Sequence, residues 1–180
     1  MWAEAVACLT DWQPASTEQQ VLRDEYLTFL AAHQDGIMRE CRSGHLTASA
    51  LVMNRQRDRV LLTLHPKVGR WLQLGGHIET GDAGLRSAAL REAQEESGIE
   101  QIEVSDDPVR LDKHPVRCGA GMSRHLDVQF LGLAADDAQE TISSESEDLR
   151  WFGLDELPDD LDPSVRALIE DSRHKVIHRI

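Results

Sequence analysis

No apolar run in this chain of 180 residues is long enough to cross a lipid bilayer, so a membrane-embedded protein is not expected. A secretory signal is also lacking, because the stretch from Met1 to Cys8 carries Glu4 and does not have the basic, apolar and small-residue order of such signals. The three cysteines, Cys8, Cys41 and Cys118, are scattered and odd in number, which supports neither a disulfide framework nor a CxxC metal site. We therefore expect a cytoplasmic protein with reduced thiols and no membrane partner.

Basic residues are scarce: 19 Lys and Arg stand against 32 Asp and Glu, which gives a formal net charge of -13. A field of that sign repels duplex DNA, RNA and anionic membranes, so no long nucleic acid is expected as a partner. A small anionic ligand would bind only where basic groups or a divalent cation locally reverse the field.

Patterns of apolar and turn-forming residues predict a helical N-terminal extension over residues 1–44 and one main domain over residues 45–180. In the extension, Ser16 to Gln19 reads as a capping box that opens a helix over residues 17–33. The main domain is expected to hold a hairpin of residues 46–53 and 60–64, a helix over 84–97 ended by Gly98, strands near 103–111, 126–133 and 148–152, and a last helix from Asp162-Pro163 toward Arg173. Strands and helices do not alternate strictly, which favours a mixed sheet flanked by helices over a doubly wound sheet.

The helix over residues 84–97 has an unusual inward stripe. With about 100° of rotation per residue, three alanines and three glutamates all fall within roughly 80° of Leu85. These residues are Ala88, Ala89 and Ala93, then Glu92, Glu95 and Glu96. Three carboxylates turned toward a core repel one another and resist desolvation unless a cation compensates them, and oxygen ligands of this kind suit Mg²⁺ or Mn²⁺.

A plainer interpretation is that the glutamates form an ordinary solvated face, as most charged helix faces do. The amphipathic phase argues against it, and so does the preceding Gly75-Gly76 pair, because glycines let bare backbone approach a cation or a phosphate closely. A glycine pair by itself indicates only a tight turn.

Residues 76–99, which read GHIETGDAGLRSAALREAQEESGI, resemble the Nudix box, and Arg91 through Ile99 match its REuxEExGu part in full. Two departures stand out: Asp82 takes the place of the usual glutamate, and the gap from Asp82 to Arg91 is one residue longer than the common pattern. Both lie in the loop and leave the spacing of the helical glutamates unchanged. Weaker likeness extends from His45 to Gly81 and over the segment LRWFGLDEL at residues 149–157.

The resemblance implies an α/β fold of the Nudix type, an α/β/α sandwich with a mixed β-sheet, here with the N-terminal helical extension added. It also implies hydrolysis of a small anionic diphosphate substrate, with a Mg²⁺ or Mn²⁺ ion held by Glu92, Glu95, Glu96 and the carbonyl of Gly76. The ion would activate water while a carboxylate accepts the proton. Arg91 is expected to organise the site through ion pairs with Glu95 or with Glu79 or Asp82. Family members often pair, so a homodimer that uses the N-terminal helix is a further expectation.

Other residues are candidates for supporting roles. The general base is expected among Glu92, Glu95 and the loop residues Glu145 and Glu147, although loop acids are as often merely solvated. Substrate contacts are expected from Lys67, Arg70 and Arg124 toward phosphate and from His77, His125 and Asp127 in the pocket. A zinc site of His114, Cys118 and His125 matches no standard ligand spacing.

Two other functions remain open. Isopentenyl diphosphate isomerase resembles this chain in fold and length, but it needs a reactive cysteine on the strand that precedes the helix, where this chain has Leu72-Gln73-Leu74-Gly75. A non-catalytic Nudix-like module that binds a nucleotide for regulation is the second, because fold and motif do not by themselves determine function. The identity of the substrate lies beyond the motif.

Overall fold

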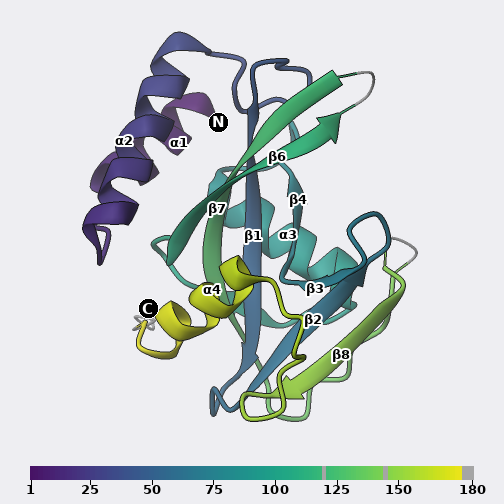
Figure 1. Ribbon diagram of the computed structural model, residues 1–180. Coiled ribbons are helices and arrows are strands. Elements are labelled where there is room, and N and C mark those ends of the chain that lie inside the picture. The colour runs from purple at the N-terminus through teal and green to yellow at the C-terminus, as the bar shows by residue number, and fades with distance from the viewer. Residues whose placement is uncertain (119–120, 144–145, 176–180) are drawn as a thin grey trace.

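The computed structural model describes residues 1–118, 121–143 and 146–175 (Figure 1). Its helices are α1 (Trp2–Asp11), α2 (Thr17–Ala32), α3 (Leu85–Ser97) and α4 (Pro163–Arg173). Its strands are β1 (His45–Asn54), β2 (Arg59–His65), β3 (Arg70–Leu72), β4 (Leu74–His77), β5 (Ile102–Val104), β6 (Arg110–Cys118), β7 (Gly121–Ala134) and β8 (Asp148–Gly153).

Strand β1 is the centre of a mixed sheet. It pairs with β7 in parallel along its whole length, from His45 opposite His125 to Asn54 opposite Ala134. On its other side β1 pairs antiparallel with β4 at one end and with β2 at the other. Among the described residues the sheet continues from β2 to β3 and β8, and from β7 to β5 and β6. The mixed sheet expected from the sequence is confirmed.

Helices cover both faces of this sheet, and the side chains of β1 show why. Strand side chains alternate between faces, and all ten residues of β1 are buried. Ala50 and Val52 belong to the core that includes the apolar stripe of α3, whereas Leu51 and Met53 belong to the core that includes α4. Figure 1 shows α4 in front of the sheet and α3 behind it. The expected α/β/α layers are therefore present.

The N-terminal extension packs on the same core as α3. At the start of α2 the side chain of Ser16 accepts a hydrogen bond from the amide of Gln19, which is one of the two bonds of the predicted capping box. The side chain of Gln19 exchanges two hydrogen bonds with the backbone of Leu111 in β6, and the hydroxyl of Tyr26 donates to the carbonyl of Asp112 at 2.6 Å. Helix α1 was not predicted, and the domain boundary at residue 45 stays a prediction.

One strand prediction was wrong. The single strand expected near residues 103–111 is two strands, β5 and β6. The amides of Ser105 and Val109 still donate to β7, at the carbonyls of Leu131 and Gln129, so residues 106–108 bulge out of the ladder between them. Pro108 has no amide hydrogen to donate, which suits it to this break. The predicted hairpin, the helices α3 and α4 and the strand β8 are confirmed.

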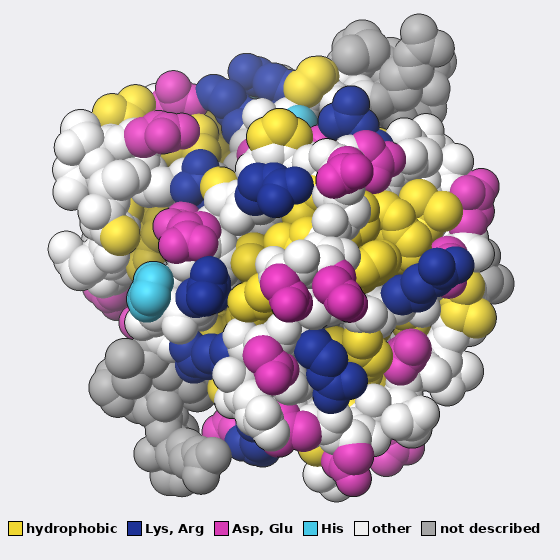
Figure 2. All heavy atoms as spheres, turned by 60° about the horizontal axis from the view of Figure 1, so that its bottom comes forward, with side chains coloured by type: hydrophobic (Ala, Val, Ile, Leu, Met, Phe, Trp, Pro, Cys, Tyr) yellow, Lys and Arg dark blue, Asp and Glu magenta, His cyan; other side chains and the backbone are white. Residues whose placement is uncertain are grey.

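The surface carries charges of both signs. On the face shown in Figure 2, acidic and basic side chains are interspersed around small apolar areas, so the negative net charge is not gathered into one patch there. None of the described helices is both long and apolar enough to span a membrane.

Candidate active site

The glutamates of α3 meet the backbone of β4 at its two glycines. A Cβ atom on Gly76 would lie only 2.7 Å and 2.8 Å from the two carboxylate oxygens of Glu92. Non-bonded carbon and oxygen atoms do not approach so closely, so a glycine at this position is what lets the carboxylate of Glu92 rest against the strand. The side chain of Glu92 is only 12% exposed.

Glu96, one turn further along α3, contacts the same strand. Its Oε2 accepts a hydrogen bond of 3.2 Å from the amide of Gly75. Gly75 itself is pressed against β1, because a Cβ atom there would lie 2.3 Å from the Cβ of Ser49. Two carboxylates of the predicted ligand set, Glu92 and Glu96, therefore both contact the glycine pair of β4.

Arg91, on α3, bonds both to the loop between β4 and α3 and to glutamates of its own helix. Its Nε and Nη2 donate to the two carboxylate oxygens of Asp82, each at 3.0 Å, and Nη2 also donates to the carbonyl of His77. Its Nη1 donates to Glu92 and to Glu95, again at 3.0 Å each. The expected ion pairs of Arg91 with Asp82 and Glu95 are present, and its organising role stays a prediction.

The pKa values of the Arg91–Asp82 pair favour the charged forms. Burial alone would raise the pKa of Asp82, but hydrogen bonds from Arg91 and from the amide of Glu79 outweigh it and hold that pKa below its usual value. The hydrogen bond to Asp82 raises the pKa of Arg91 well above its usual value. The shorter Asp82 thus makes a bidentate ion pair across a loop that is one residue longer than the common motif.

The prediction that all three glutamates face the interior was wrong for Glu95. Its side chain is 61% exposed and lies at the rim of the site, paired with Arg91. On a helical projection Glu95 sits about 80° from Leu85, at the edge of the inward stripe. A side chain at the edge of the stripe can either pack inward or stay at the surface. For Glu95 the ion pair with Arg91, one turn earlier, holds it at the surface.

We call Asp82, Glu92, Glu95 and Glu96, with Arg91 and Gly76, the carboxylate site. Arg91 supplies one positive charge to four carboxylates, three of which contact it directly. The remaining negative charge and the hard oxygen donors fit a divalent cation such as Mg²⁺ or Mn²⁺. Glu92, Glu95 and Glu96 would hold the ion together with the carbonyl of Gly76.

Asp127 lies on the opposite face of the sheet, inside a polar network. It is 4% exposed and accepts hydrogen bonds from Thr47 at 2.8 Å and from Ser49 at 2.7 Å. The side-chain amides of Gln73 and Gln129 donate to it as well. Burial raises its pKa while these hydrogen bonds oppose the rise. This carboxyl group is a buried acceptor that links β1 and β7 with Gln73, the residue between β3 and β4.

His77 and His125, both predicted to line the pocket, come together with a histidine that the sequence analysis does not single out. The ring centroids of His77 and His125 lie 5.3 Å apart, and each also contacts His45, at the start of β1. No sequence motif joins the three, because they lie on three strands. Cys118, an alternative ligand considered with His125, has a side chain outside the described residues.

Among the remaining candidates that the structure describes, Arg70 and Arg124 bond to residues outside the carboxylate site. Arg70 pairs with Asp162 at the N-terminus of α4, and Lys67 is exposed in the turn after β2. Arg124 donates to the carbonyl of Ser43. Glu147 is exposed just before β8. Glu145 lies outside the described residues.

The residue that caps α3 comes from α1 and was not predicted from the sequence. Leu85, the first residue of this helix, donates its amide hydrogen to Oε2 of Glu4 at 3.0 Å, and a Cβ atom on Gly84 would collide with the same carboxylate. A carboxylate at a helix N-terminus is stabilised by the unpaired amides and the helix dipole. Helix α1 therefore supports the helix that carries the glutamates. The signal in the sequence was that Gly84, at the start of α3, has no side chain with which to cap the helix.

Comparison with protein families and solved structures agrees with this geometry. The family model described as NUDIX domain matches residues 44–172. Among curated proteins, no sequence is similar enough to count as a match.

Several solved structures share the fold. A NUDIX-family hydrolase from Clostridium perfringens is 22% identical with a TM-score of 0.57, over 72% of this chain and 94% of that one. The dihydroneopterin triphosphate pyrophosphohydrolase of E. coli is 19% identical with a TM-score of 0.56, over 69% and 92%. The NUDIX domain of NrtR from Shewanella oneidensis, solved in complex with ADP ribose, is 23% identical with a TM-score of 0.53, over 81% and 96%.

Proposed function

The chain belongs to the NUDIX family of hydrolases, and from that premise we propose that it cleaves a diphosphate linkage in a nucleoside diphosphate-linked or similar small substrate, with the help of Mg²⁺ or Mn²⁺. The observation that carries the proposal is the contact of Glu92 and Glu96 with the bare backbone of Gly75 and Gly76. A solvated helix face would not bring two carboxylates against a strand in this way.

The residues of the carboxylate site have different roles. Glu92, Glu95, Glu96 and the Gly76 carbonyl hold the cation, and Arg91 keeps Glu92 and Glu95 oriented through its hydrogen bonds. When bound, the cation supplies charge neutralisation of the diphosphate and acidifies a water molecule. Its charge also offsets the repulsion between an anionic substrate and a chain of net charge -13.

A carboxylate accepts the proton of the attacking water. Glu92 and Glu95 are candidates within the site, and Glu145 and Glu147 are candidates from the loop before β8. Among the first two, Glu95 is the more exposed and therefore the better placed to release a proton to solvent.

A panel of substrates tests this proposal. ADP ribose, dihydroneopterin triphosphate, oxidised nucleoside triphosphates and dinucleoside polyphosphates are incubated with Mg²⁺ or Mn²⁺, and release of phosphate, diphosphate or monophosphate is measured. The first two compounds are chosen because structural neighbours are described with them. We expect turnover of at least one compound, and dependence on the cation.

The variant Glu96→Gln completes the test. We expect its turnover to fall by roughly 10³-fold, because the variant loses a ligand of the cation. The bound cation would stabilise several kcal/mol of transition-state charge. Glu100→Gln, just beyond α3, is the matched control and should keep wild-type turnover. Undiminished activity in Glu96→Gln contradicts the ligand assignment. Tight binding of a compound with no product after hours would instead select the non-catalytic nucleotide-binding module. The cytoplasmic location and the homodimer stay predictions.

A further inference from the structure

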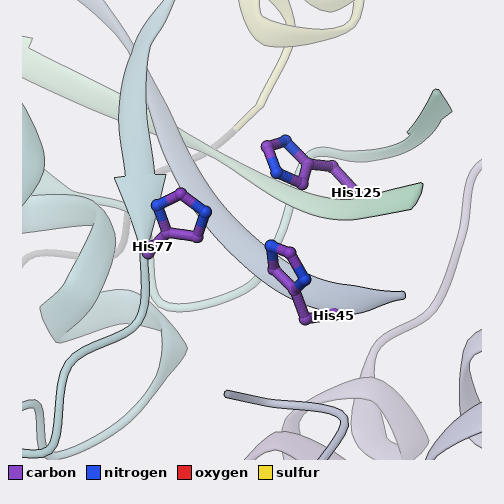
Figure 3. Close-up of side chains that lie close together, drawn as sticks. All are labelled: His45, His77 and His125. Carbon is purple, nitrogen blue, oxygen red and sulfur yellow. The ribbon is translucent and has the colours of Figure 1, made fainter. Parts of the chain in front are cut away.

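Three histidines from three strands converge on the face of the sheet opposite α3. His45 begins β1, His77 ends β4, and His125 lies on β7 directly across from His45. Figure 3 shows the three rings turned toward a shared space. One ring nitrogen from each residue lies within 4.8 Å of the nitrogens of the other two. We call these three residues the imidazole cluster.

The burial of His45 and of one ring nitrogen of His125 needs an explanation. His45 is 0% exposed, and neither of its ring nitrogens makes a hydrogen bond of ordinary geometry. Nε2 of His125 is also buried without such a bond. A buried polar atom without a partner costs about 1–3 kcal/mol. Tilted and edge-on ring contacts alone would account for the packing of the rings, but not for these nitrogens.

The protonation state of the imidazole cluster suits ligation. Burial lowers the pKa of His45, with the nearby Cys41 carbonyl opposing part of the effect. Burial, followed by the neighbouring histidines, lowers the pKa of His125 to about 3. Neutral imidazole is the form that binds metal ions.

We propose that His45, His77 and His125 together bind one divalent transition metal ion of the Zn²⁺ class. Imidazole nitrogen prefers Zn²⁺, Co²⁺, Ni²⁺ or Cu²⁺ to Mg²⁺, which favours oxygen. Three protein ligands leave a coordination position for water or for a substrate group, as in catalytic zinc sites.

The imidazole cluster is separate from the carboxylate site although the two adjoin along β4. Successive strand residues point to opposite faces. A side chain on Gly76 would meet Glu92 of α3, whereas the next residue, His77, contacts His45 and His125 on the other face. Strand β4 therefore stands between a site of hard oxygen donors and a site of softer nitrogen donors.

Titration of the full-length, chelator-treated protein with Co²⁺ and Zn²⁺ tests the proposal. Co²⁺ reports its ligands through visible d–d absorption, and Zn²⁺ affinity follows from calorimetry and from displacement of Co²⁺. With excess Mg²⁺ present to occupy the carboxylate site, we expect one Co²⁺ per chain at the imidazole cluster, displaced by Zn²⁺. Zn²⁺ should also raise the midpoint of thermal unfolding, because an ion that binds only the folded state stabilises it.

The variants His45→Asn and His125→Asn should each weaken Zn²⁺ binding by more than about 100-fold, the upper end of what loss of an outer-shell partner costs. His174→Asn, an exposed histidine at the end of α4, is the matched control. Cys41→Ser tests the other grouping of potential ligands, His33, Asp35 and Cys41, and should bind normally. Circular dichroism of each metal-free variant establishes that it is folded.

Glu96→Gln separates this proposal from the proposed hydrolase. It should keep wild-type Co²⁺ absorption while losing Mg²⁺-dependent turnover. The imidazole site is refuted if wild-type protein shows no d–d absorption at millimolar Co²⁺. It is equally refuted if folded His45→Asn and His125→Asn both keep wild-type affinity, or if Cys41→Ser or Glu96→Gln abolishes the signal.

Discussion

The two faces of β4 differ in chemistry and in how far they can be recognised from sequence. On the α3 side, Gly75 and Gly76 meet two glutamates of one helix, and the donors are oxygen atoms. On the other side His77 meets His45 and His125, and the donors are nitrogen atoms. The first set is mostly contiguous in the sequence, whereas the second comes from residues up to 80 positions apart. A sequence motif therefore reveals only the face of a strand that contacts residues nearby in the chain.

Gly76→Ala should have the largest effect among changes confined to the α3 side. The new methyl group would displace the Glu92 carboxylate, and a misplacement of about 1 Å costs roughly 10²-fold in turnover. Steady-state kinetics with Mg²⁺ measures it. Gly81→Ala is the control, because a Cβ atom there meets nothing within 4 Å.

The same variant probes the independence of the two faces. The added methyl group points toward α3, so Zn²⁺ affinity at the imidazole cluster should change less than about twofold. Equal losses of turnover and of Zn²⁺ affinity would show that the two faces of β4 act as one site.

Arg91→Lys should destabilise the protein by about 2 kcal/mol, because lysine cannot reproduce the two-pronged contact with the nearly buried Asp82. Urea unfolding measures the loss. Arg55→Lys is the matched control: its pair with Glu103 is exposed, so the change should stay below about 0.5 kcal/mol. Equal effects of the two substitutions would contradict an organising role for Arg91.

Glu4→Ala should cost about 1 kcal/mol, the typical value of a lost helix cap. The carboxylate of Glu4 accepts from the first amide of α3, so the variant measures how far the N-terminal extension supports the α3 side. Glu100→Ala, a change of the same kind on the exposed surface, should be close to neutral. If Glu4→Ala does not change the free energy of unfolding, α1 supports α3 through packing alone.

Acidification should lower the free energy of unfolding through the histidine side of β4, and this is the smallest of the expected effects. Below about pH 6.5 the unfolded chain protonates His125, whereas the folded chain does so only near its lowered pKa of about 3. The contribution of neutral His125 to the free energy of unfolding is thus complete above about pH 6.5, and it is lost as the pH falls toward 3. After allowance for screening by solvent, the loss at pH 5 should be about 0.5–1 kcal/mol.

Urea unfolding of metal-free protein at pH 7, 6 and 5 checks this prediction. His125→Asn should show a shallower loss than the wild type, and His174→Asn should follow the wild type. The comparison with His125→Asn matters because the bond to Asp112 raises the pKa of His114, which acts in the opposite direction. Parallel curves for wild type and His125→Asn would contradict a lowered pKa of His125 in the folded protein.

Local patterns in the sequence determined the helix α3 with its stop at Gly98, the cap at Ser16, the hairpin of β1 and β2, and the carboxylates of the site, because helix period and turn chemistry depend on neighbours within a few residues. Strand pairing and packing depend on residues that are distant in the chain, so they are visible in the three-dimensional structure and not in the sequence. The tertiary structure placed Glu95 at the surface through its ion pair with Arg91, divided β5 from β6, brought Glu4 to the start of α3, and set His45 opposite His125.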